Sequence, residues 1–481
     1  MDSLSTLSFK AFLWNAIGQF FTQIISFIVG IILARILSPN EYGLLAMALF
    51  FNGISNVFID GGFSSALIRK KDPSQKDLST VFIFNIIMAL FMYASIYLLS
   101  PSISSFFKES KLTLIIRILS LNFIIVAFGT IQGVLLTKKL DYKTQSIIRV
   151  ISVIISGTIG VFMALNGYGI WALVIQIILQ SIIWVVSIWV VCKWKPIFFF
   201  SKASFKEFFS FGSKLMMSSF LYEFFAQAYP IIIGRFFSIT QVGYYNRAES
   251  YQKITSYTIS NMVNSVVFPS LSLVQDDNER LREGYRKIIK LTMFITVPLM
   301  TGLILLSNPL IVLLITEKWL PIVPYLQWLC IVGMFQPLNA IILNILNVKG
   351  RSDIFLYLII VNKSMMILSI LIGFYWGIIG LIIGQVFTAL LTFLISAYYS
   401  GRYIKYSVIA QIMDILPFFA LSFVMFIIGY FLGFKIENYI LRISFQFIIC
   451  IILYFSFAKL FNLSALKELI NIILTLSSKK K

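Results

Sequence analysis

The amino-acid sequence predicts an all-α polytopic membrane protein of about fourteen transmembrane helices, arranged as two parallel six-helix lobes plus a C-terminal helix pair. The first observation is composition: 59% of the 481 residues are hydrophobic and 12% are charged, whereas soluble domains carry about 25% charged residues. The second is the near-continuous series of apolar runs, each long enough to cross a hydrocarbon core of about 30 Å. The third is an internal repeat, described below.

The individual spans follow from the charged or turn-forming residues that interrupt the apolar runs. The predicted spans are 11–34, 42–66, 78–99, 112–136, 146–165, 169–191, 212–234, 243–273, 289–315, 320–346, 354–374, 377–399, 410–433 and 438–458. The first run lacks a small-residue cleavage site after it, so we expect an uncleaved first helix. The expected domains are an N-terminal lobe (1–200), a C-terminal lobe (201–405), and an accessory helix pair with an amphipathic cytoplasmic tail (406–481).

Basic residues set the orientation of these spans, because Lys and Arg accumulate in cytoplasmic loops. With the N-terminus inside, most of the 39 basic residues fall in loops on the inner side. We therefore expect both termini in the cytoplasm of a bacterium and the chain in its inner membrane. The formal net charge of +20 is accounted for by anionic lipid headgroups at the cytoplasmic surface, so no nucleic-acid partner is expected.

Several classes of chemistry are disfavoured by the residues available. The chain has no histidine, and its three cysteines, Cys192, Cys330 and Cys450, lie far apart in or beside apolar spans, so neither a metal site nor a disulfide framework is indicated. The predicted outer loops are too short to hold catalytic carboxylates. We therefore expect neither an enzyme nor a cofactor, and an integral-membrane glycosyltransferase is the least favoured alternative.

The internal repeat has a spacing of 200 residues. The stretch from Ile32 to Ala48 returns from Ile232 to Ala248, with Ile, Arg, Ser, Gly and Ala identical in register. A second echo relates Gly169-Ile170-Trp171-Ala172-Leu173 to Gly377-Ile378-Ile379-Gly380-Leu381. An even number of helices per repeat gives both halves the same orientation in the membrane. This organisation is typical of transporters whose substrate path runs between two lobes.

The repeat region also carries a family resemblance that covers nearly the whole chain. It rests on three segments: Leu33-Ala34-Arg35-Ile36-Leu37-Ser38-Pro39-Asn40-Glu41-Tyr42-Gly43, Asp60-Gly61-Gly62-Phe63-Ser64-Ser65-Ala66-Leu67-Ile68-Arg69-Lys70-Lys71-Asp72, and Ile233-Gly234-Arg235-Phe236 with Gly243-Tyr244-Tyr245-Asn246-Arg247-Ala248. In these segments the chain resembles the Wzx-type polysaccharide flippases of the multidrug/oligosaccharidyl-lipid/polysaccharide exporter superfamily, especially the colanic-acid-exporter-like branch. The resemblance implies export of undecaprenyl-diphosphate-linked oligosaccharides to the periplasmic leaflet, for capsule, exopolysaccharide or O-antigen assembly.

A flippase of this kind needs a polar cavity for a charged glycan headgroup, so ionisable residues inside spans are the first candidates. Lys253 and Lys363 lie near the middle of their spans and are expected to attract the diphosphate. Arg247 and Arg149 are expected at the outer and inner mouths of this cationic cavity. The alternative for Lys253 is neutralisation by Glu249, because the two residues have the i,i+4 spacing of a helix ion pair.

Uncharged amides within the spans are candidates for contact with sugar hydroxyls, although single amides in membranes often link helices instead. They are Asn52, Asn56, Gln132, Asn261, Asn264, Gln336, Asn339 and Asn344. Glu223, also near the middle of a span, is the candidate for proton or sodium coupling, although its proximity to Lys253 argues against that role.

The mechanism we expect is alternating access by a monomer, with the lipid tail remaining in hydrocarbon and polysaccharide polymerases as possible partners. Two rivals share the fold class. A drug or cation antiporter of the same superfamily would favour acidic over basic residues at the midplane. A peptidoglycan-lipid flippase would differ chiefly in its substrate.

Overall fold

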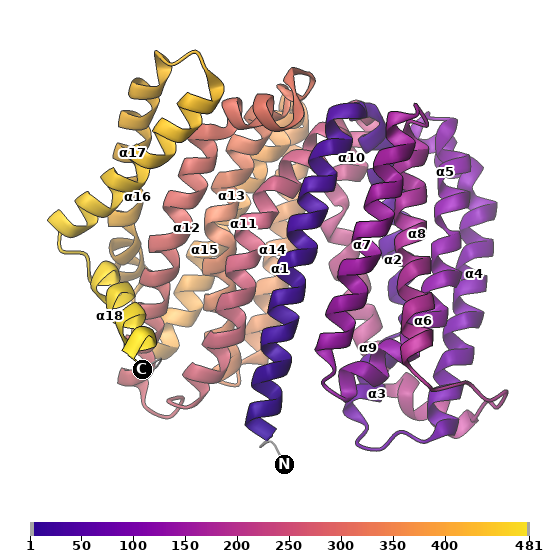
Figure 1. The fold of residues 1–481 in the computed structure, drawn as a ribbon. Coiled ribbons are helices and arrows are strands. Elements are labelled where there is room, and N and C mark those ends of the chain that lie inside the picture. Colours follow the sequence, from indigo (N-terminus) through magenta and orange to yellow (C-terminus); the bar gives the residue numbers. More distant parts are fainter. Residues whose placement is uncertain (1–3, 479–481) are drawn as a thin grey trace. The chain divides into compact units, whose positions relative to one another are not determined.

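The computed structural model describes residues 4–478, except for the side chains of residues 4–9, 262, 264–266, 268–270, 352, 472, 473 and 475–478. The described chain is helical without strands (Figure 1). It divides into two compact units, residues 1–243 and 244–481, with the boundary inside α11. The predicted lobes were defined by the repeat rather than by compactness, so their boundaries stay a prediction.

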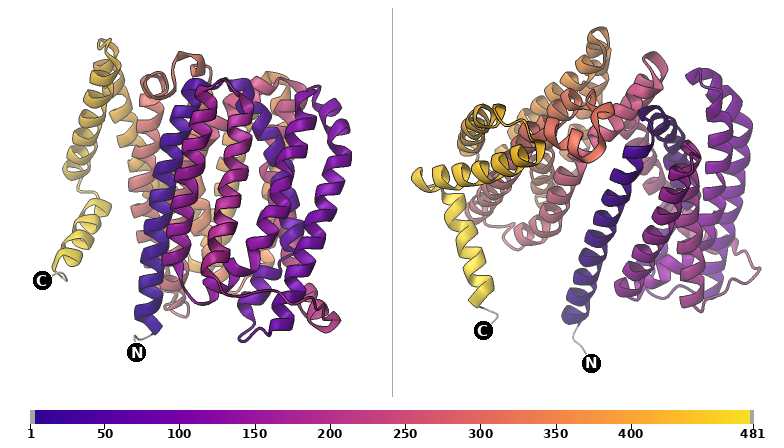
Figure 2. Two further views of the ribbon diagram at one scale, coloured as in Figure 1. Left: turned by 45° about the vertical axis from the view of Figure 1, so that its right-hand side comes forward. Right: turned by 45° about the horizontal axis from the view of Figure 1, so that its top comes forward.

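The first unit, residues 1–243, contains ten helices within its described part and the first residues of an eleventh. They are α1 (Leu4–Ile36), α2 (Pro39–Asp60), α3 (Phe63–Arg69), α4 (Gln75–Phe107), α5 (Lys111–Leu119), α6 (Leu121–Lys138), α7 (Tyr142–Leu165), α8 (Ile170–Val191), α9 (Lys202–Ala226), α10 (Ala228–Phe236) and the start of α11 (Ile239–Ser272). Within this unit α7 packs against α1 and α8, and α6 packs against α4 and α8. Figure 2 shows these long helices running side by side.

The second unit, residues 244–481, is built around α12, which packs against α13, α16, α17 and α18. Its elements are the remainder of α11, α12 (Asn278–Ile315), η1 (Glu317–Trp319), α13 (Ile322–Val348), α14 (Ser352–Gly373), η2 (Phe374–Trp376), α15 (Gly377–Ile404), α16 (Val408–Phe434), α17 (Tyr439–Leu460) and α18 (Ser464–Ser478). The short α18 is the predicted amphipathic tail helix, and it contacts α12 and α17.

Eleven helical stretches in the described part of the chain are long and apolar enough to cross a membrane. The longest, Asp353–Ile404, contains both α14 and α15. Neither α9 and α10 nor α11 is among them, and α11 carries charged or polar residues along much of its length. The all-α, multi-pass fold class is thus confirmed, whereas the count of about fourteen spans stays a prediction.

Helix α2 shows how local sequence sets the boundaries. Ser38 caps its start: the Ser38 hydroxyl accepts from the backbone N–H of Glu41 at 3.4 Å, and the Glu41 carboxylate accepts from the backbone N–H of Ser38 at 2.6 Å. At the other end Gly61 and Gly62 have φ of +56° and +73°, which other L-residues rarely adopt. The predicted span 42–66 is therefore broken here, and α3 begins separately.

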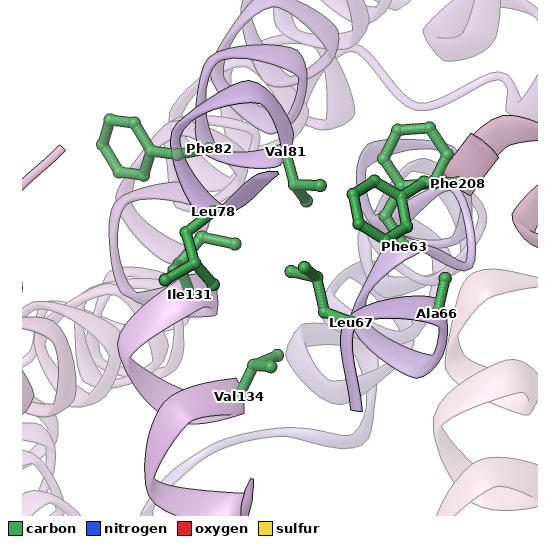
Figure 3. Packing of buried hydrophobic residues seen from close by; sticks show 9 residues of the cluster. All are labelled: Phe63, Ala66, Leu67, Leu78, Val81, Phe82, Ile131, Val134 and Phe208. Carbon is green, nitrogen blue, oxygen red and sulfur yellow. The ribbon is translucent and has the colours of Figure 1, made fainter. Parts of the chain in front are cut away.

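An apolar cluster fixes one end of the first unit. Its buried residues come from α3, α4, α6 and α9: Phe63, Ala66, Leu67, Leu78, Val81, Phe82, Ile131, Val134 and Phe208 (Figure 3). Trp194, from the segment between α8 and α9, packs against the same cluster. Short α3 is thereby held against three longer helices, and the segment that leads to α9 is held beside them.

A buried carboxylate links two helices of the second unit. Asp414 of α16, whose side chain is 9% exposed, forms ion pairs with Arg286 and with Lys290, the latter at 2.9 Å. The hydroxyl of Tyr406 donates to the same carboxylate. Because one acid of α16 pairs with two cations of α12, this contact links the two helices.

Candidate functional site

The two copies of the repeat motif meet within the first unit. A Cβ atom on Gly43 would collide with the carbonyl oxygen of Ile239, and a Cβ on Gly243 would collide with the carbonyl oxygen of Pro39. Each glycine of one copy thus lies against the helix start of the other. The glycines of the repeat are required by close approach of two backbones, and this approach brings the N-terminal turns of α2 and α11 together.

Beyond this crossing, one face of α11 carries a row of polar side chains that we call the α11 stripe: Glu249, Lys253, Tyr257 and Asn261. Each step of four residues advances about 40° around the axis, so the four side chains form a row that winds through about 120° from Glu249 to Asn261. Lys253 Nζ lies 3.0 Å from Glu249 Oε1, as the sequence spacing predicts, and the Lys253 side chain is still 46% exposed. Tyr257 and Asn261 are exposed as well. The stripe therefore presents an ammonium, a phenol and an amide.

Arg247 is rotated away from Lys253 around the same helix. Its guanidinium is 5.1 Å from the ring centroid of Tyr251, one turn further along. Six residues separate Arg247 from Lys253, which places them roughly 120° apart around the axis. The two predicted cationic residues of α11 therefore do not form one cluster along the helix.

The face of α11 next to the stripe is buried by an amide–hydroxyl network. The Ser256 hydroxyl donates to Gln336 Oε1 of α13 at 2.7 Å, and Gln252 Nε2 donates to the Ser256 hydroxyl at 2.7 Å. Gln252 and Ser256 are almost completely buried. A Cβ on Gly333 would collide with the Gln252 amide. Gln336, predicted as a lumen residue, thus links two helices, which is the alternative that applies to single membrane amides.

The remaining predicted residues of the second unit are more dispersed. Lys363 is half-buried on α14, and its neighbour Asn362 donates to Thr392 of α15 at 2.8 Å. Asn339 of α13 has a buried Oδ1 without a hydrogen-bond partner among the described residues. Asn344 is half-buried on the same helix. The side chain of Asn264 lies outside the described residues.

In the first unit four polar residues gather where α2 packs on α9, and we call them the α2–α9 cluster: Asn52, Asn56, Glu223 and Gln227. Asn56 donates to Asn52 at 2.9 Å, and Gln227 donates to Glu223 at 3.2 Å. Glu223 lies against Gly53, because a Cβ there would lie 2.4 Å from Oε1. The carboxylate and the two asparagines are therefore neighbours on adjoining helices.

Two further predicted residues of the first unit lie elsewhere. Gln132 of α6 is completely buried. When the oxygen and nitrogen of its amide are assigned so that each has a hydrogen-bond partner, Gln132 donates to the Phe128 carbonyl at 2.9 Å and accepts from the Trp189 indole at 3.3 Å. It thus joins α6 to α8. Arg149 is half-buried on α7.

The second unit also contains an apolar cavity of about 360 Å³. Side chains of α12 and α17 supply most of its wall, and the lining includes Phe294, Pro298, Phe447, Tyr454 and Leu469. The proton of the Tyr454 hydroxyl is already used within the protein, because it is donated to the Phe294 carbonyl at 2.9 Å. The cavity therefore offers hydrocarbon contact and little polar recognition.

Comparison with known proteins places this geometry in a family. The sequence profile described as "Polysaccharide biosynthesis protein" matches residues 32–324, which is more than half of the chain. The chain belongs to this polysaccharide biosynthesis protein family. The matched range includes both copies of the repeat motif, the α2–α9 cluster and the α11 stripe.

Three curated relatives have names that refer to polysaccharide biosynthesis. The teichuronic acid biosynthesis protein TuaB of Bacillus subtilis (strain 168) is 30% identical over 364 residues, covering 74% of each chain. The lipopolysaccharide biosynthesis protein WzxC of Escherichia coli (strain K12) is 25% identical, covering 88% of this chain and 87% of WzxC. The succinoglycan biosynthesis transport protein ExoT of Rhizobium meliloti (strain 1021) is 26% identical, covering 68% and 67%.

Solved structures show that the polysaccharide biosynthesis protein shares its fold with known transporters. An inward closed conformation of the lipid II flippase MurJ aligns with a TM-score of 0.77 and 21% identity, covering 95% of this chain and all of MurJ. An inward-facing multidrug resistance MATE family transporter of the MOP superfamily aligns with a TM-score of 0.60 and 16% identity, covering 80% and 96%. These two structures show that the fold is shared, and the family match over residues 32–324 confirms the predicted family resemblance.

Sequence reasoning missed two members of these sites, Tyr257 and Gln227. Both stand four residues after a residue that was identified, Lys253 and Glu223 respectively. Applying the i,i+4 rule to every polar residue of these spans, rather than to charged pairs alone, would have found both. Because one is a phenol and the other an amide, a search for charged residues within the spans did not include them.

Proposed function

We propose that this polysaccharide biosynthesis protein is a flippase that moves an undecaprenyl-diphosphate-linked oligosaccharide from the cytoplasmic to the periplasmic leaflet of a bacterial inner membrane by alternating access. Three relatives named for teichuronic acid, lipopolysaccharide and succinoglycan biosynthesis support the substrate class. The fold shared with a lipid II flippase supports the transport of a lipid-linked saccharide. The products served would be capsule, exopolysaccharide or O-antigen.

The observation that carries the proposal is the α11 stripe. An exposed lysine, phenol and amide on a membrane helix are costly against lipid tails, so the stripe must face water or a polar ligand. Its spacing extends over about 12 Å, from Lys253 to Asn261, at 1.5 Å per residue. An ammonium suits a diphosphate, and the phenol and amide can donate to and accept from sugar hydroxyls. The stripe thus offers consecutive contacts to the two parts of the headgroup.

Other residues have supporting roles in this proposal. Positive charge along the path would come from Lys363, Arg247 and Arg149. The buried Oδ1 of Asn339, which has no hydrogen-bond partner among the described residues, would accept a hydrogen bond from a sugar hydroxyl. Gln132 and Gln336 are left out, because both amides are already used between helices. The apolar cavity would give the polyprenyl tail a protein surface to follow.

The α2–α9 cluster is the candidate for ion coupling. Glu223 is half-buried beside glycine backbone and two asparagines, and a carboxylate in such surroundings can exchange a proton or hold a sodium ion with amide oxygens. Glu223 accepts a hydrogen bond from Gln227 at 3.2 Å. Coupling through Glu223 would make translocation depend on an applied proton or sodium gradient, and Glu223→Gln would abolish that dependence.

Translocation is best tested with purified protein in proteoliposomes that contain fluorescent undecaprenyl-diphosphate oligosaccharide, by following the fraction accessible to a membrane-impermeant quencher. The variants are Lys253→Met, which removes the charge, and Lys253→Arg, which retains it. We expect a loss of roughly ten-fold or more for Lys253→Met, because a charge-assisted hydrogen bond is worth about 1.5–3 kcal/mol. We expect partial retention for Lys253→Arg.

The matched control is Lys139→Met, since Lys139 is exposed at the end of α6 and outside the proposed site. Equal rates for Lys253→Met and the unmodified protein would remove the stripe from the path. Parallel liposomes with lipid II or with a cationic drug test the two rival substrates. Movement of either one, with no movement of any oligosaccharide lipid, would overturn the proposed substrate class.

A further inference from the structure

The segment between α8 and α9, residues 192–201, differs from the other loops of the first unit in composition. It reads Cys-Lys-Trp-Lys-Pro-Ile-Phe-Phe-Phe-Ser, and Lys202 and Lys206 follow at the start of α9. No acidic residue occurs between positions 192 and 206. Lysines and aromatic rings thus alternate along one short stretch that emerges from a membrane helix.

Hydrogen bonds to the first turns of α4 fix the backbone of this segment. Gln75 Nε2 donates to the carbonyl of Lys195 at 2.6 Å. The backbone N–H of Ile197 donates to Ser79 Oγ at 3.0 Å, and that of Ser201 donates to Thr80 Oγ1 at 3.0 Å. Ser79 and Thr80 are completely buried. The segment is therefore a defined strap rather than a freely moving linker.

Two rings, one within the strap and one in the first turn of α9 after it, pack against the apolar cluster of Figure 3. Trp194 and Phe205 both pack against that cluster, and the Trp194 indole also donates to Gln75 Oε1 at 2.6 Å. The rings between them point outward instead. Phe198 is fully exposed, and Phe199 and Phe200 are 44% and 42% exposed. The fold thus uses the flanking aromatics for packing and leaves the central ones on the surface.

The exposed rings are surrounded by positive charge. Lys193, Lys195, Lys202 and Lys206 are all exposed, and the Lys76 ammonium lies 5.1 Å from the ring centroid of Phe199. None of the four exposed lysines has an ion-pair partner among the residues that the structure describes. The strap thus combines exposed aromatic rings with exposed basic side chains.

Two carboxylates lie beside the strap, Glu207 directly after it in the sequence and Asp77 against Ser204, and both already have an ion-pair partner. Lys70 Nζ lies 3.0 Å from Asp77 Oδ2 and 2.9 Å from Glu207 Oε2. Burial of Lys70 lowers its pKa, but the hydrogen bonds to Glu207 and Asp77 outweigh that effect and raise the pKa overall. Asp77 and Glu207 are thus paired with Lys70 and not with the lysines of the strap.

We propose that residues 193–206 form a membrane-surface anchor that binds anionic phospholipid headgroups, with Phe198 inserted among the acyl chains and the lysines at the phosphates. Aromatic residues favour the membrane interface, and basic side chains near an anionic surface are attracted by about 1 kcal/mol each. The proposal is independent of the transported substrate.

A lipid surface is favoured over a protein partner by the position of the strap. Val190 and Val191, the last residues of α8, are 79% and 48% exposed, as expected for side chains that face lipid. Phe198 follows only seven residues later, so the chain has at most roughly 25 Å of reach beyond the end of the span. The exposed rings therefore stay close to the interface from which α8 emerges.

The test uses the full-length protein in nanodiscs, with the three native cysteines replaced and a single environment-sensitive NBD fluorophore at Phe198→Cys. Quenching is measured with lipids that carry a doxyl group near the carbonyl end of the acyl chain. In discs that contain phosphatidylglycerol we expect strong quenching and blue-shifted emission. In discs of phosphatidylcholine alone we expect less of both. Strong salt should weaken the anchor in phosphatidylglycerol discs, because it screens surface charge.

Matched positions separate insertion from general proximity. The same fluorophore at Asp72→Cys, an exposed residue of the loop before α4, should report water in both lipids. Each Lys→Gln change at positions 193, 195, 202 and 206 should reduce the ratio of inserted to exposed Phe198 roughly five-fold in phosphatidylglycerol. Lys139→Gln, on another loop, should leave that ratio unchanged.

Two results would overturn the anchor. Water-like emission at position 198 in both lipids would show that the rings do not enter the bilayer and would favour a protein partner. Equal quenching in both lipids and at all salt concentrations would show insertion without recognition of anionic headgroups. The salt series on the labelled protein with all four lysines retained gives this answer even if a Lys→Gln variant does not fold.

Discussion

Asn40 donates its side-chain Nδ2 to Thr240 Oγ1 at 3.4 Å, although the two residues lie 200 positions apart in the sequence. They occupy equivalent places in the two copies of the repeat. The reciprocal contacts of Gly43 with Ile239 and of Gly243 with Pro39 surround them. The repeat is thus a pair of helix starts that pack on each other, which is a relation that the sequence spacing alone did not predict.

Alanine at this crossing should destabilise the protein. In Gly43→Ala or Gly243→Ala the new methyl group meets backbone that has no side-chain freedom to move away, and overpacking of this kind costs about 1–3 kcal/mol. We expect a lower midpoint of thermal unfolding in detergent. Gly302→Ala is the control, because a Cβ there meets nothing within 4 Å, and its midpoint should not fall. If the unfolding midpoint of Gly302→Ala fell by the same amount, close packing at the crossing would not be the cause of the destabilisation.

Gln336 and Asn261 should separate stability from transport. Gln336→Leu removes the acceptor of the Ser256 hydroxyl and should lower stability by about 1–2 kcal/mol. Asn261→Leu changes an exposed residue of the α11 stripe and should reduce translocation without a lower unfolding midpoint. Thermal unfolding and the proteoliposome assay on both variants check this. A transport defect in Gln336→Leu at full stability would return that amide to the substrate path.

Replacement of Asn339 should change stability and transport in opposite directions. Its buried Oδ1 has no partner among the described residues, and an unsatisfied buried polar atom costs about 1–3 kcal/mol. Asn339→Leu should therefore raise the unfolding midpoint in the absence of substrate while it reduces the translocation rate. Unchanged translocation would mean that the amide is not a substrate contact.

The start of α12 should respond to pH. Hydrogen bonds from the backbone N–H groups of Arg280 and Glu279, with the charge of Arg280, lower the pKa of Asp277. Because the pKa of Asp277 is lower in the folded protein than in the unfolded chain, its carboxylate stabilises the fold at pH values above the unfolded-state pKa of about 3.9. This stabilisation is lost as the pH falls through the folded-state pKa. Asp277→Ala should thus lower the unfolding midpoint at pH 7 and have a smaller effect near pH 3.

Asparagine at the same position is the control for that pH series. Asn caps helices about as well as Asp but does not titrate. Asp277→Asn should keep most of the stability that Asp277→Ala loses, and the difference between Asn and Asp should shrink on acidification. A pH-independent loss in Asp277→Ala would show that capping geometry, and not charge, sets the effect.

Much of the fold was predictable because apolar runs and turn residues are local signals. The predicted end of the span 146–165 and the predicted start of the span 169–191, for example, coincide within one residue with the end of α7 and the start of α8. Where the prediction differed, the reason is also local. The Gly61-Gly62 pair that separates α2 from α3 was present in the sequence, but the apolar residues after it masked the break.

The site was less predictable, because the sequence does not show how a helix is rotated. Gln336 and Asn261 are both amides within predicted spans, yet one joins α11 to α13 and the other is exposed. The pair Glu249–Lys253 was predictable, since both residues belong to one helix and their spacing fixes their distance. The contact of Glu223 with Gly53 required knowledge of which helices are neighbours.

The polarity of α11 also has a consequence for how the protein is made. Charged residues at the centre of a helix oppose its insertion by the translocon by about 2.5–3.5 kcal/mol each, and α11 carries Arg247, Glu249 and Lys253. An isolated α11 is thus a poor candidate for independent insertion during synthesis. Its entry into the bilayer should depend on helices that have already been inserted, so sequence changes that delay those neighbours should appear as errors of topology and degradation.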